Sequence, residues 1–194
     1  MKRLFCFAVI VAATMCPAQA QSQRQNDRLD NGGFEDPAID GYRFFDEGLP
    51  GWTVDMAGVE IINEAYERGF EARSGSQFLA LNGSGAIFQD VPTEPGAIYQ
   101  LVFHLDNEPD AAGATTLTVS AGSASADFEV PSEQEGYRQE ALRFVGAAGA
   151  AVTRIMFTDT TGADYGAHVD DVSVAIIDGR AKLHRSHRPS PRPK

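Results

Sequence analysis

The chain has 194 residues, and its 27 acidic residues outnumber its 16 lysines and arginines, which gives a formal net charge of −11. Residues 21–179 hold all the acidic residues, eight arginines and no lysine, a net charge of −19, whereas residues 180–194 hold six basic residues and no acidic one. This acidic body argues against nucleic acid as the main partner, because phosphate binding depends on basic surfaces. It suits a secreted protein in contact with calcium or salt, or serves solubility alone.

Residues 1–20 have the features of a secretory signal peptide: a basic start, the apolar run "LFCFAVIVAATM" and the small-residue cleavage site "AQA". We therefore expect cleavage after Ala20 and a periplasmic or extracellular location. Lipid modification at Cys16 is the weaker alternative, because "ATM" before it fits a lipobox poorly. Both cysteines lie in this segment, so the mature domain must be held by its core, by a metal or by both. No later apolar run is long enough to span a membrane.

Short β-like runs separated by turn residues follow one another along the mature chain. They are "LDNGGFE", "GWTV", "VEII", "SQFLALN", "AIFQDV", "IYQLVFHL", "TTLTVSA", "ADFEV", "YRQEALRFV", "AVTRIMFT" and "HVDDVSVAII". Alternation is clearest where Tyr99, Leu101, Phe103 and Leu105 interleave with polar residues. Only "NEAYERGFEA" suggests a helix. This pattern predicts an all-β, antiparallel β-sandwich of the jelly-roll type.

The composition divides the mature chain into three parts. Residues 21–28 are polar and are predicted to be disordered. Residues 29–178 form the predicted jelly-roll domain. Residues 179–194 are basic and rich in proline, which predicts a disordered tail. This tail is expected either to bind an anionic surface or to fold back on the acidic body.

Two acidic motifs near opposite ends of the domain predict a cation site. "NGGFEDP" offers the carboxylate of Glu35 and the carbonyl of Gly33 beside glycines that permit close backbone approach. "HVDDV" places Asp170 and Asp171 side by side in a predicted strand, so one carboxylate points inward, which is costly without a partner.

The first and last strands of a jelly roll often lie side by side, which would bring these motifs together. We hypothesise that Glu35, the Gly33 carbonyl and one aspartate bind Ca²⁺, a cation that prefers oxygen ligands. Asp170 is favoured because strand alternation puts it on the face of Val172 and Val174. The alternative is a carboxylate that caps a turn by hydrogen bonds, without a metal.

The order of motifs resembles the choice-of-anchor C family of bacterial secreted proteins. It is also similar to the related plant cell-wall proteins of unknown function; both groups are assigned a galactose-binding-like jelly roll. The motifs are "NGGFEDP", "PGWTV", "VEII", "SGSQFLALNG", "GAIFQDV", "PGAIYQLVFHL", "TLTVSAG", "LRFVG", "IMFTDT" and "HVDDVSV". The chain departs from the family at its end, where it has only the basic tail in place of an apolar anchor.

The first and last of these motifs are similar to those of carbohydrate-binding modules that hold a structural calcium between them. The resemblance implies Gly33, Glu35 and Asp170 or Asp171 as ligands, with a carbonyl of the "ARSGSQ" turn, near Ser74 or Ser76, as a further one. It also implies a glycan or polysaccharide as partner.

Catalytic motifs are scarce in the sequence. No G-x-S-x-G nucleophile elbow is present, no thiol remains after signal cleavage, and no pair of carboxylates is singled out by spacing. We therefore predict a secreted, non-catalytic module that binds carbohydrate, extracellular matrix or cell envelope. The alternatives are a glycan-active jelly-roll enzyme and a structural surface protein that binds other proteins.

A glycan site needs flat aromatic side chains. Trp52 is expected in the core, and the spare aromatic residues fall in predicted loops: Tyr42, Phe44, Phe45, Tyr66, Phe70 and Tyr165. The predicted outward strand positions, such as Gln100 and His104, offer no stacking platform. The sequence thus predicts a glycan at the loop end of the sandwich, with Tyr66, Arg68 and Tyr165 as contacts. The alternative is that these rings only pack their own loops.

Overall fold

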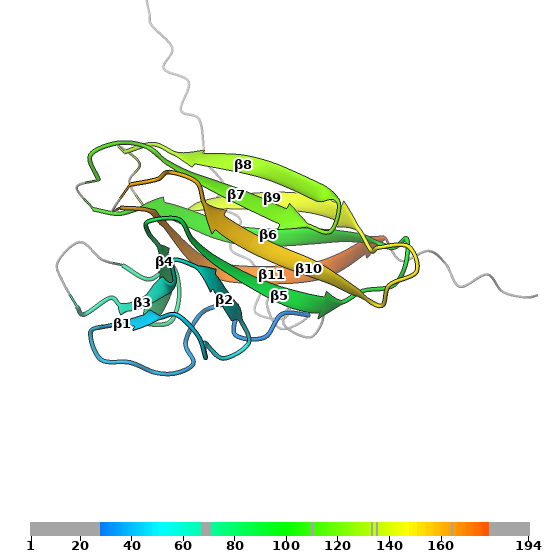
Figure 1. The fold of residues 1–194 in the computed structure, drawn as a ribbon, viewed down its shortest axis with the longest axis horizontal. Helices are drawn as coiled ribbons and strands as arrows, with labels where there is room; N and C mark the ends of the chain where they lie inside the picture. Colours follow the sequence, from blue (N-terminus) through cyan, green and yellow to red (C-terminus); the bar gives the residue numbers. More distant parts are fainter. Residues whose placement is uncertain are drawn as a thin grey trace, which may run out of the picture.

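The computed structural model describes residues 28–178, except for 67–70, 110, 133, 135 and 164. Its strands are β1 (Tyr42–Phe45), β2 (Thr53–Met56), β3 (Val59–Asn63), β4 (Gln77–Leu81), β5 (Gly85–Pro92), β6 (Ile98–Asn107), β7 (Thr115–Ala121), β8 (Ala124–Val130), β9 (Arg138–Val145), β10 (Val152–Asp159) and β11 (Ala167–Asp178). They form a six-stranded sheet in the order β1-β3-β4-β11-β6-β9 and a five-stranded sheet in the order β2-β5-β10-β7-β8 (Figure 1). Every strand pair is antiparallel, which confirms the predicted all-β sandwich.

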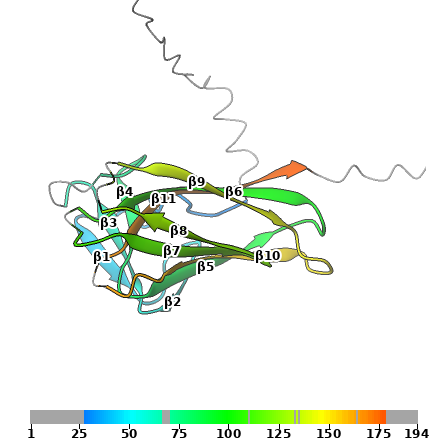
Figure 2. The ribbon, with the colours of Figure 1, turned by 90° about the horizontal axis from the view of Figure 1, so that it is seen from above.

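The core lies between the two sheets, which Figure 2 shows as two layers. In β6 every second residue is buried, so the predicted alternation holds along its whole length. Phe103 of β6 meets Phe157 of β10 edge to face, with ring centroids 5.2 Å apart, and this contact joins the sheets. Trp52 is also in the core: its indole N–H donates to the carbonyl of Asn31 at 3.0 Å.

The segment before β1 differs from the sequence-based expectation. "LDNGGFE" was predicted as a strand, but it forms turns, with Asn31 and Phe34 at positive φ. It nevertheless lies beside the last strand, because the N–H of Arg28 donates to the carbonyl of Val174 and the N–H of Val172 to the carbonyl of Gly32. The predicted proximity of this segment to the last strand of the domain is therefore confirmed, although the prediction that the segment is itself a strand is wrong.

The structure also differs from two other local predictions. Residues 42–45, expected in a loop, form the edge strand β1. The suggested helix at 63–72 is absent from its described part, where residues 64–66 form a turn. The signal peptide, the polar segment 21–27 and the basic tail lie outside the described residues. Within the described chain, no helix is long and apolar enough to cross a membrane.

A bulge in β11 explains the paired aspartates. Asp170 pairs with His104, but the next matched pair is Ser173 with Val102, and Asp171 between them has φ 49°. The extra residue resets the alternation, so Val169 and Val172 both face the core while Asp170 faces outward. The prediction that Asp170 shares the face of Val172 is therefore wrong.

The two neighbouring glycines of "NGGFE" differ in how closely they approach β11 at the bulge, and this difference gives a test of the packing. A Cβ at Gly32 would overlap the carbonyl oxygen of Val172, whereas a Cβ at Gly33 would meet only an oxygen of Asp170 at 3.9 Å. We expect Gly32→Ala to destabilise the fold by about 1–3 kcal/mol or more, because backbone must move to relieve the overlap.

Gly33→Ala is the matched control and should unfold close to the wild-type denaturant midpoint. Equal midpoints for the two variants in urea unfolding would contradict this account of the contact.

Candidate functional site

The outer face of the six-stranded sheet carries a row of residues defined by strand register. Phe44 of β1 pairs with Glu60 of β3, Glu60 with Ala80 of β4, and Ala80 with His168 of β11. Directly paired residues of antiparallel strands place their side chains on the same face. Ala80, which is fully buried, has the smallest side chain in this row, and a hollow lies between Glu60 and His168, which both line it.

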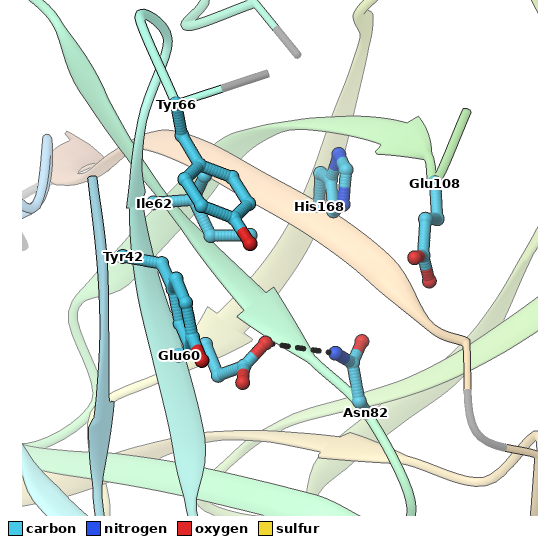
Figure 3. Close-up of a pocket in the computed structure, with 7 residues that line it drawn as sticks. All are labelled: Tyr42, Glu60, Ile62, Tyr66, Asn82, Glu108 and His168. Carbon is cyan, nitrogen blue, oxygen red and sulfur yellow. Dashed lines mark hydrogen bonds between the residues drawn. The ribbon is translucent and has the colours of Figure 1, made fainter. Parts of the chain in front are cut away.

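A pocket of about 300 Å³ lies over this hollow, at the end of the sandwich where β1, β3 and β4 are found. It is lined by Tyr42, Glu60, Ile62, Tyr66, Asn82, Glu108 and His168 (Figure 3). These residues come from the three strands β1, β3 and β11 and from the loops that follow β3, β4 and β6. In Figure 3 the two tyrosines stand on one side, and His168 and Glu108 on the other.

Two tyrosine rings form the aromatic wall of the pocket. The ring centroids of Tyr42 and Tyr66 are 4.9 Å apart and tilted by 58°. Both side chains are about half exposed, at 52% and 45%. Tyr66 is held by its own turn, in which its N–H donates to the carbonyl of Asn63 at 2.9 Å. The wall is therefore both fixed by the backbone and open to a ligand.

Carboxyl and amide groups form the rest of the polar lining, from Glu60 beside Tyr42 to Glu108 on the far side (Figure 3). Asn82 donates from Nδ2 to a carboxylate oxygen of Glu60 at 3.2 Å, drawn as the dashed line in Figure 3. Burial raises the pKa of Glu60, and burial followed by the charge of Glu60 raises the pKa of Glu108. The backbone N–H of Gly166 hydrogen-bonds the Glu108 carboxyl and lowers its pKa against these effects, whereas buried Asn82 Oδ1 and Glu108 Oε2 have no close donor among the described residues.

The imidazole of His168 completes the pocket as a neutral group. It is buried against Phe78, with ring centroids 4.6 Å apart. Burial lowers the pKa of His168 to about 3, so the ring carries no charge at pH 7. Among the described lining residues there is no cationic side chain, and the pocket is therefore acidic.

The structure brings only part of the predicted glycan site together. Tyr66 lines the pocket, whereas the half-buried Tyr165 lies with its hydroxyl beside Gly113 and is not a lining residue. Arg68 falls outside the described residues. The sequence analysis missed Glu60, Asn82, Glu108 and His168, since their proximity depends on strand order and register. The alternation of "VEII" was the one signal that marked Glu60 as outward-facing.

A second polar cluster joins β11 to the turn before β4. Asp170, fully buried, accepts backbone hydrogen bonds from Arg73 at 2.9 Å and Ser74 at 3.1 Å. Glu35 accepts the backbone N–H groups of Ser76 and Gln77 at 2.8 and 2.9 Å. Two carboxylates from opposite ends of the domain thus bind one turn, as in the metal-free alternative.

This cluster also offers oxygen atoms to a hard cation. Asp170 Oδ1 accepts one amide, and Glu35 Oε2 accepts one hydroxyl, so each oxygen keeps a lone pair. Gly33 lies next to Asp170, and Asp171 accepts the hydroxyl of Ser74 at 2.6 Å. Burial raises the pKa of Asp170 to about 7, although the hydrogen bonds from the backbone amides lower it. Among the described residues, however, no group of three or more His, Cys, Asp or Glu side chains could hold a metal.

The two antiparallel sheets define a jelly-roll sandwich, a fold that several solved structures share. TmCBM61, solved in complex with β-1,4-galactotriose, shares 16% identity and a TM-score of 0.51 over 77% of this chain and 98% of its own. The enzymatically active domain of bacteriophage CBA120 tailspike protein 4 gives 16% identity and 0.53, over 78% and 22%. The arabinose-bound α-L-arabinofuranosidase MgGH51 gives 13% and 0.56, over 77% and 26%. The chain thus spans about a quarter of the last two proteins.

The chain belongs to the family described as "Protein of unknown function (DUF642)", which matches residues 27–175. The match covers nearly the whole described domain. No curated protein matches the sequence. The structural similarities, all below 25% identity, establish the fold, and the function rests on the site itself.

Proposed function

We propose that this protein is a secreted, non-catalytic module that binds a glycan in the pocket between Tyr42 and His168. The main observation behind this proposal is that the pocket combines two aromatic rings with carboxyl and amide oxygens. Sugars present an apolar ring face, which packs on aromatic rings, and hydroxyl groups, which donate to such oxygens. The fold shared with galactotriose-bound TmCBM61 supports this proposal, as does the signal-like segment at residues 1–20. Membership of the choice-of-anchor C group belongs to the same proposal.

Removing one tyrosine ring should weaken glycan binding and leave the fold intact. We expect Tyr42→Ala and Tyr66→Ala each to lower the affinity for the best ligand of a glycan array about tenfold or more, which is about 1.4 kcal/mol. Both rings are half exposed, so the melting temperature should change little. Titration calorimetry with the array ligand measures the effect.

Phe44→Ala is the matched control, because Phe44 lies on the same strand and is 53% exposed but does not line the pocket. Affinity lost equally in all three variants, or in none, would contradict the assignment of the site. Tyr165→Ala tests the sequence-based alternative, in which the loop beside Gly113 makes the contact.

We also propose that Ca²⁺ stabilises the domain at Glu35, Asp170 and the carbonyl of Gly33. The free lone pairs of the two carboxyl groups and the burial of Asp170 beside them support this proposal. A ligand bound only by the folded state stabilises it by RT ln(1 + [L]/Kd), about 2.7 kcal/mol at a hundredfold excess over Kd. The melting temperature should therefore be higher in millimolar calcium than in chelator.

Asp170→Asn should abolish this difference, and Asp171→Asn shows which aspartate matters. Asp159→Asn is the control: Asp159 is another buried carboxylate that binds backbone amides, from Ser84 and Thr161, far from the cluster. If wild-type protein melts at one temperature in chelator and in calcium, the amide hydrogen bonds alone hold the turn.

One observation favours a second candidate, a glycan-cleaving enzyme. Glu60 and Glu108 are two carboxyl groups of raised pKa in a single pocket, the chemistry that glycoside hydrolysis uses. Release of reducing sugar from a polysaccharide panel, abolished by Glu108→Gln, would overturn the non-catalytic proposal. We expect no turnover on any substrate that binds.

A further inference from the structure

From the chemistry of the pocket we infer that its ligand is an amino sugar with a free, protonated amine. The inference rests on the proposed glycan-binding function and specifies its ligand class. It excludes uronic acids, sulfated sugars and phosphorylated sugars as ligands of this site.

The charge of the pocket is the first argument for a cationic ligand. Glu60 and Glu108 both line it, His168 is neutral, and among the described lining residues no arginine or lysine offsets the two carboxylates. The charge of Glu60 acts on Glu108 through space, so the two groups share one electrostatic environment. An anionic ligand in the pocket would be repelled by both carboxylates, whereas an ammonium group would be attracted by both.

The hydrogen-bonding capacity of the polar groups that line the pocket is the second argument. Glu108 accepts a backbone hydrogen bond from Gly166, but Asn82 Oδ1 and Glu108 Oε2 are withdrawn from solvent with no close donor among the described residues, and such acceptors are costly to leave unpaired. Asn82 Nδ2 is already committed to Glu60. The wall therefore has a surplus of acceptors, and an ammonium group brings three donors and no acceptor. An N-acetyl group would bring one donor and a carbonyl acceptor, which matches this wall poorly.

The two tyrosine rings of the aromatic wall provide the third argument. Tyr42 and Tyr66 lie across the pocket from Glu108, and Glu60 lies beside Tyr42 (Figure 3). Tyrosine rings attract a cation within about 6 Å of the ring and also pack on the apolar face of a sugar ring. One pyranose with an amine thus satisfies both walls at once, which neither a simple cation nor a neutral sugar does.

The test compares four oligosaccharides of equal length by calorimetry on the whole protein at pH 7: glucosamine, N-acetylglucosamine, galactose and galacturonic acid oligomers. We expect the glucosamine oligomer to bind at least tenfold more tightly than the two uncharged ones, and the galacturonic acid oligomer not to bind. Glu60→Gln and Glu108→Gln should each lower glucosamine affinity about tenfold and change galactose affinity less than threefold.

Glu129→Gln removes the same charge from an exposed position on β8, in the other sheet, and controls for general attraction to the acidic body. It should leave the preference unchanged, also in 0.5 M salt, and melting curves establish that each variant is folded. Equal affinity for charged and uncharged sugars, or binding of galacturonic acid, would overturn the amino-sugar inference and leave the glycan-binding proposal standing. Absence of binding to all four, and to a glycan array, would overturn both.

Discussion

The hydrogen bonds from the backbone of Arg73 and Ser74 to Asp170 connect the middle of the six-stranded sheet to the turn that covers it. Because the bulge at Asp171 turns Asp170 outward, the carboxylate is buried by this turn and not by the core. The same turn, through the carbonyl of Ser76, accepts the N–H of Glu64, two residues before Tyr66. The turn that Asp170 holds is therefore hydrogen-bonded to the segment that carries Tyr66, although Asp170 does not itself line the pocket.

The sequence predicted the sandwich well where side-chain alternation was strong, and failed where backbone conformation decided the outcome. β6 alternates without interruption, so its buried face was readable. The turn at Asn31 and Phe34 was mistaken for a strand because its residue types do not reveal positive φ. β1 was missed because three of its four residues are exposed, so no burial pattern marked it. The bulge in β11 reversed the expected direction of Asp170, and a one-residue shift of this kind leaves no signal in a single sequence.

The candidate site was predictable only in part for a related reason. Tyr66 was identified because an aromatic residue in a polar loop is conspicuous. Glu60 and His168, by contrast, meet because both flank Ala80 in the sheet order β3-β4-β11, which joins strands far apart in the chain. Asn82 and Glu108 follow the ends of two strands that reach the same edge of the sandwich. Residue types alone do not specify such order or register, whereas they do specify which positions face outward once the register is known.

The direction of β11 gives the domain a front and a back. Its first residues, at His168, line the pocket, and its last, Asp178, pairs with Ile98 at the start of β6, roughly 33 Å away at the usual rise per residue of an extended strand. Arg28 is on the same remote side, where its guanidinium donates to the carbonyl of Pro92. Both connections to the rest of the chain therefore leave from the back of the domain. A connection through either of them would leave the pocket at the opposite end of the domain from the point of connection.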